Sequence, residues 1–101
     1  MPEMRYLDYA ELAERLLAMA EERHGTQSSE RFLLGQDPAV LFTGLVTGLV
    51  VDKVTVSQGL YENIVSEMTA LIASETDPWM RGDHQYWVDQ LTELQKAATA
   101  T

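Results

Sequence analysis

The stretch VLFTGLVTGLVV, residues 40–51, decides how this chain of 101 residues folds. It holds no charged residue, and Gly44 and Gly48 lie four positions apart within it. A helix that crosses a membrane needs about 20 apolar residues, whereas a run of about 10–14 is typical of a buried core helix. Because acidic residues close the run at both ends, the stretch is predicted to be a core helix and not a membrane span.

A β-hairpin is the alternative structure for this part of the chain. Residues 46–56 are rich in β-branched side chains, which suit strands. The Asp-Lys pair at the only plausible turn lacks the Gly or Asn that tight hairpins favour. Asp37 followed by Pro38 is a typical helix start, because Asp accepts an N-cap hydrogen bond and Pro suits the first helical position. These signals favour a helix over about 38–52 and leave the hairpin as the alternative.

The two glycines carry a second prediction. A helix over this stretch is apolar on almost every side, which is typical of a buried helix. Glycine in a helix costs about 1 kcal/mol relative to alanine. Close approach of another helix would compensate that cost, so Gly44 and Gly48 are predicted to be positions of close helix packing.

Caps and apolar spacing predict the remaining helices. Asp8 with Glu11 forms a capping box, Gly25 supplies a stop, and Thr55 with Gln58 forms a second box. The fold class is therefore all-α, a small helical bundle in one domain over 1–101. The four main helices are predicted at about 8–24, 38–52, 56–74 and 78–98, with a short helix near 29–34 and frayed ends at about 1–4 and 97–101.

The last predicted helix has two distinct faces. Its predicted core stripe is Met80, His84, Trp87, Leu91, Leu94 and Ala98. Its second face consists of Trp79, Asp83, Tyr86, Gln90 and Glu93. Met and aromatic residues are enriched in interface cores, and Trp and Tyr in binding hot spots. The sequence therefore predicts a protein-binding surface, with packing at the core margin as the alternative; its residues are Trp79, Met80, Asp83, Tyr86 and Gln90.

Composition narrows the class of partner. The chain has sixteen acidic and seven basic residues, a net charge of −9. Phosphate backbones and anionic lipid repel such a chain, so neither nucleic acid nor a membrane is expected as a partner, while a basic protein is favoured. The N-terminus lacks the basic start and apolar run of a signal peptide, so a cytoplasmic location is expected. The absence of cysteine excludes disulfides and thiolate metal sites.

No catalytic motif is present, and no cofactor is predicted. The strongest enzymatic fragment is Glu21 with His24, which an i, i+3 spacing places on one helical face as in di-iron carboxylate bundles. A complete site would require a second copy from a homodimer. The alternative is a solvated last helical turn in which His24 complements the helix dipole.

The leading hypothesis is a non-enzymatic helical protein that acts through protein–protein binding as a homodimer. Its small size, acidity and lack of a catalytic set are typical of accessory or regulatory proteins of bacteria and phages. One alternative is an inhibitor or immunity-type protein that blocks a basic active site, including as a nucleic-acid mimic. The other is a dimeric di-metal enzyme built on Glu21 and His24.

Overall fold

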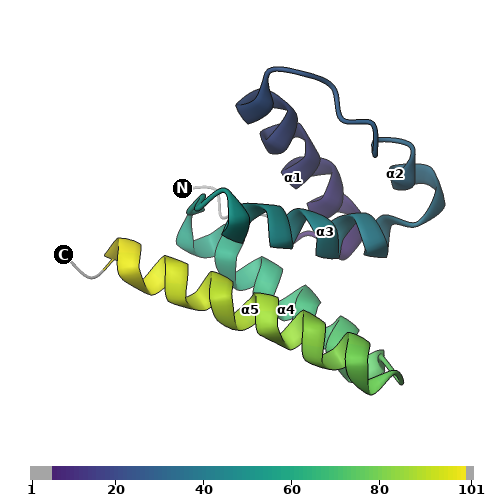
Figure 1. Ribbon diagram of the computed structural model, residues 1–101, viewed down its shortest axis with the longest axis vertical. Helices are drawn as coiled ribbons and strands as arrows, with labels where there is room; N and C mark the ends of the chain where they lie inside the picture. Colours follow the sequence, from purple (N-terminus) through teal and green to yellow (C-terminus); the bar gives the residue numbers. More distant parts are fainter. Residues whose placement is uncertain (1–5, 100–101) are drawn as a thin grey trace.

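A computed structural model describes residues 6–99 and shows five helices with no strand in that range, which confirms the all-α prediction (Figure 1). Four of the helices are long, and together they form a small helical bundle. None of the helices within residues 6–99 combines the length and apolar character needed to cross a bilayer. The helices are α1 Tyr9–His24, α2 Leu33–Gln36, α3 Pro38–Val51, α4 Gln58–Ser74 and α5 Pro78–Thr99.

Residues 40–51 are helical along their whole length, so the hairpin alternative is wrong. The Asp37 side chain accepts the Val40 N–H at 3.2 Å, and Pro38 occupies the first turn as its fixed φ favours. The helix ends where Asp52 donates its N–H to the Gly48 carbonyl and Lys53 adopts a φ of 56°.

α3 lies between α1 and α5, and α4 packs beside α5 (Figure 1). The four fully buried residues of α3 are at most 1% exposed, so one side of this helix forms the centre of the core. The α1 side of the core comes from residues at the helical spacing expected of a buried face. The core of α3 is Leu41, Phe42, Val46 and Leu49, and that of α1 is Leu12, Ala13, Leu16 and Leu17.

Two buried amide side chains form hydrogen bonds with backbone segments that lie just before α1 and α4. Gln95 accepts the Val56 N–H at 2.9 Å and donates to the Val56 carbonyl at 3.0 Å. Asn63 makes the same pair of bonds to the backbone of Leu7, both at 2.9 Å. Each amide satisfies one backbone donor and one backbone acceptor that burial would otherwise leave unpaired.

The first of these contacts corrects the predicted start of α4. We expected a capping box at Thr55 and Gln58, but Gln95 of α5 bonds to the N–H and the carbonyl of Val56, and the cap is instead Ser57. The Ser57 side chain accepts the Leu60 N–H at 3.3 Å. The helix therefore begins two residues later than the predicted residue 56.

Two further boundaries differ from the prediction. The short helix spans Leu33–Gln36 and not 29–34, because turn hydrogen bonds, including one from the Glu30 N–H to the Ser28 hydroxyl, occupy the preceding residues. α5 continues to Thr99, so residues 97–99 are helical and not frayed. The expected fraying at 1–4, and at the last two residues, lies outside the described range.

The predicted core stripe of α5 is confirmed at His84 and Leu91 but differs at its other positions. Trp87 and Leu94 are only half-buried, and Met80 and Ala98 are exposed. The difference arises because Gln95 is buried where it bonds to the backbone of Val56, and an apolar pattern does not identify a buried glutamine. The residues that α5 buries are His84, Val88, Leu91 and Gln95.

Candidate protein-binding surface

The outward side of α5 carries the aromatic residues singled out in the sequence. Trp79 is 88% exposed and Tyr86 is 54% exposed, and their spacing of seven residues places them on one side of the helix. Met80 is 43% exposed, and Asp83 between the two aromatics is also exposed, whereas Gln90 is half-buried. We call these residues the aromatic face: Trp79, Met80, Asp83, Tyr86 and Gln90.

Packing within α5 orders part of this face. The rings of Tyr86 and Trp87 meet edge to face, with centroids 5.0 Å apart and planes at 84°. Edge-to-face pairs are favourable because the positive edge of one ring meets the negative face of the other. The half-buried Trp87 thereby supports Tyr86, while no ring contact of this kind involves Trp79 in the described part of the chain.

Carboxylates surround the aromatic face. Asp77, Asp83, Asp89 and Glu93 are all exposed on or beside α5. α5 has two cations: the Arg81 guanidinium donates to the Glu75 carbonyl at 2.9 Å, and Lys96 pairs with Glu93 at 3.7 Å, so the carboxylates outnumber the cations. The electrostatic potential over this surface is therefore negative, which favours positively charged partners.

The first turn of α5 also borders a shallow hollow of about 150 Å³. Met80 and His84 line it together with Val40 and Thr43 of α3 and Leu71 of α4. The N-terminal ends of α3 and α5 therefore share one partly apolar surface at this end of the bundle.

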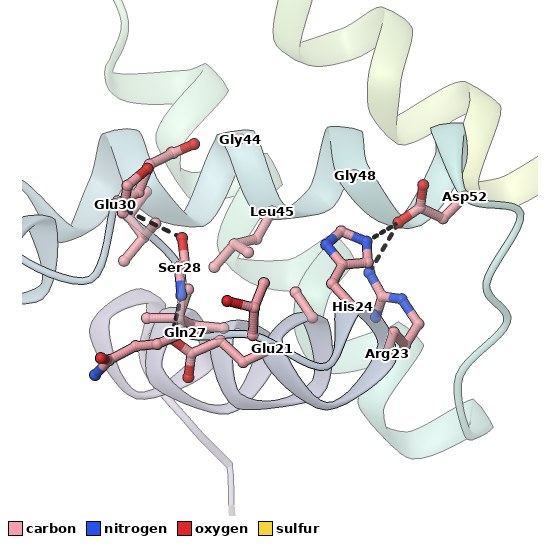
Figure 2. A pocket seen from close by; sticks show the side chains of 15 residues that line it. Glu21, Arg23, His24, Gln27, Ser28, Glu30, Gly44, Leu45, Gly48 and Asp52 are labelled. Atoms are coloured by element: carbon pink, nitrogen blue, oxygen red, sulfur yellow. Dashed lines mark hydrogen bonds and ion pairs between the residues drawn. The ribbon is translucent and has the colours of Figure 1, made fainter.

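Gly44 and Gly48 do not pack closely against another helix, which corrects the sequence prediction. A Cβ atom added at either position would meet no atom within 4 Å. Both glycines instead line a pocket of about 440 Å³ between α1, α3 and the segment 26–30 (Figure 2). Its apolar lining is Leu17, Ala20, Leu41 and Leu45.

Ion pairs border the pocket. The Arg31 guanidinium pairs with Glu21 and lowers the pKa of that carboxyl, and the Ser28 N–H, donating at 2.8 Å, lowers it further. Asp52, at the end of α3, accepts from His24 and from Arg23, each at 3.2 Å (Figure 2). These contacts, with His24 the larger cause, hold the pKa of the Asp52 carboxyl below its usual range.

The structure gives Glu21 and His24 separate partners. Glu21 bonds to the segment that follows α1, whereas His24 bonds to the end of α3. Within residues 6–99, no three His, Asp or Glu side chains gather closely enough to hold a metal ion. The sequence shows that Glu21 and His24 share one side of α1. It does not show that they bond to two different segments, because those contacts depend on the tertiary fold.

Comparison with known proteins identifies no relative. No family model, no curated protein and no solved structure matches this chain.

Proposed function

We propose that this protein acts without catalysing a reaction, by binding another protein through the aromatic face of α5. The observation that carries the proposal is the exposure of Trp79, which is 88% accessible although Trp is among the largest apolar side chains. Burying an aromatic side chain removes about 150–250 Å² from water, or about 4–6 kcal/mol at 25 cal/mol per Å². A partner that covers Trp79 gains that free energy, before the cost of association is subtracted.

The surrounding charge supports a basic partner. Asp77, Asp83 and Asp89 would lie at the rim of any interface centred on Trp79. Lysine and arginine on the partner would complement this rim and speed association. A basic enzyme surface belongs to the same chemical class, so an inhibitory or immunity-type role is the second candidate that these carboxylates favour. An accessory or regulatory role is the first.

The experiment compares partner capture by matched variants. Wild-type protein, Trp79→Ala, Tyr86→Ala and Phe32→Ala would be immobilised and exposed to a lysate of the native host, and the captured proteins would be identified by mass spectrometry. Phe32 is 60% exposed and lies before α2, so it controls for loss of an exposed aromatic ring elsewhere.

We expect Trp79→Ala and Tyr86→Ala each to weaken capture of one basic protein by about 1–2 kcal/mol or more, as truncation of a hot-spot residue does. Phe32→Ala should capture it as wild type does, and raising the salt concentration should weaken all complexes because exposed charges are screened. Identical captured sets for the wild type and both α5 variants would contradict the proposal.

A further inference from the structure

α3 presents a mostly exposed ridge to solvent. Val40 is 56% exposed and Val51 is 65% exposed, and Gly44 between them is also exposed. With the half-buried Thr47, these residues follow spacings of 4, 3 and 4, which place them on one side of the helix. We call this set, Val40, Gly44, Thr47 and Val51, the α3 ridge.

Charge distinguishes this ridge from the other helix surfaces. α3 contains no charged residue over Pro38–Val51. Each of the other long helices exposes carboxylates, such as Glu22 on α1, Glu62 on α4 and Asp89 on α5. Because the chain carries a net charge of −9, two copies that meet along α1, α4 or α5 would bring like charges together. Along α3 they would not.

Opposite charges lie at the two ends of the ridge. Asp37 precedes α3, and its carboxylate accepts the Val40 N–H while remaining exposed. Lys53 follows the helix, is exposed, and makes no ion pair within the described residues. Asp52 at the same end is already bonded to Arg23 and His24, which leaves the Lys53 ammonium group unpaired there. A surface with a carboxylate at one end and an unpaired ammonium group at the other is complementary to the same surface turned end to end.

We propose that the α3 ridge is the contact surface of a homodimer in which α3 packs antiparallel against α3 of a second copy. A two-fold axis between residues 45 and 46 places Val40 opposite the second copy's Val51, and Gly44 opposite its Thr47. The same axis places Lys53 within one residue of the second copy's Asp37. Small residues at the centre allow the backbones to approach, and the valines pack at both ends.

The dimensions of the helix set the strength of this dimer. At 1.5 Å per residue, a helix of 14 residues is about 21 Å long, so the contact lies at the small end of specific interfaces. The dimer is therefore expected to dissociate on dilution. The ridge borders the aromatic face where Val40 and Met80 line the same hollow, but Trp79 and Tyr86 lie outside that hollow, so either proposal can fail without the other.

Cysteine cross-linking tests the arrangement, because the chain has no native cysteine. Two copies of residue 44 are offset by about 4–5 Å along the antiparallel axis, whereas two copies of residue 51 are offset by about 16 Å. A disulfide needs Cα atoms within about 4–7 Å. We therefore expect Gly44→Cys to form a covalent dimer under mild oxidation and Val51→Cys alone not to. A mixture of Val40→Cys and Val51→Cys should form the mixed dimer.

Two charge variants test the ends of the ridge. Lys53→Glu should weaken the dimer by about 2–30-fold in sedimentation, since it removes two symmetry-related exposed ion pairs. Lys96→Glu makes the same change of net charge at an exposed position of α5 and is the matched control. It should weaken the dimer less than Lys53→Glu does. Equal effects of the two variants, equal cross-linking at residues 44 and 51, or a wild-type monomer at every concentration would each overturn the proposal.

Discussion

α3 and α5 both bury one side in the core and expose apolar side chains on the other, but the two outward surfaces differ in charge and in side-chain size. The α3 ridge consists of glycine, threonine and valine and has no charge along its length. The aromatic face of α5 has Trp79 and Tyr86 among carboxylates. Judged by exposed apolar side chains alone, the two surfaces would look equivalent.

The difference separates two kinds of partner. A smooth uncharged ridge can meet its own copy, because neither size nor charge prevents two such ridges from approaching. A surface that combines large aromatic side chains with several exposed carboxylates is poorly matched to its own copy, because the carboxylates would face one another. Complementarity therefore assigns self-association to α3 and a basic partner to α5, as proposed above.

Substitutions on the inward sides of α3 and α5 are expected to change stability most. Phe42 of α3 is 0% exposed, so Phe42→Ala should lower the free energy of unfolding by about 3–5 kcal/mol. Trp87 of α5 is only half-buried, so Trp87→Ala should cost less than Phe42→Ala in spite of its larger ring. Urea denaturation of both variants measures the order. A larger loss for Trp87→Ala would mean that α5 contributes more of the core than its burial indicates.

A substitution on the outward side of α3, at Gly48, is expected to stabilise the protein. Because a Cβ at Gly48 meets open space, Gly48→Ala should raise the free energy of unfolding by up to about 1 kcal/mol through helix propensity. Gly25→Ala is the contrasting variant and should destabilise, since Gly25 caps α1 with a φ of 71°. Thermal unfolding at low protein concentration separates the two. Destabilisation by Gly48→Ala would show that this side of α3 is tightly packed.

The smallest effect concerns the ion pair at the end of α3. Since His24 and Arg23 lower the pKa of Asp52, its carboxylate stabilises the fold above the ordinary Asp pKa and loses that contribution as the pH falls through the lowered value. The stability difference between wild type and Asp52→Asn should therefore shrink as the pH falls below about 4. High salt should reduce it at every pH. A difference that stays constant down to acid pH would contradict this role.

Local signals predicted most of the fold. The capping box of Asp8 and Glu11 is present, with the Glu11 N–H donating to Asp8 at 2.9 Å, and Asp37 caps α3 as expected. These signals succeed because a cap depends on residues three or four positions apart. The start of α4 was predicted wrongly because a residue distant in sequence, Gln95, bonds to the N–H and the carbonyl of Val56.

The candidate sites were predicted less completely, for a related reason. Helical spacing placed Trp79 and Tyr86 on one side of α5, and both are exposed. The same reasoning could not determine what lies opposite Gly44 and Gly48, because that depends on how α1 and α3 diverge. The sequence predicted close packing of another helix at these glycines, whereas the structure has a pocket there.

The most direct test of the account measures oligomeric state and partner capture together for Val51→Glu and Trp79→Ala. The side chains of Val51 and Trp79 are mostly exposed, so both variants should fold. Thr69→Glu, at an exposed position of α4, controls for the added charge. We expect Val51→Glu to sediment as a monomer that still captures the partner, and Trp79→Ala to remain a dimer that does not. If Val51→Glu abolished capture while leaving the dimer intact, or if Trp79→Ala dissociated the dimer while retaining capture, the assignment of the two surfaces would be contradicted.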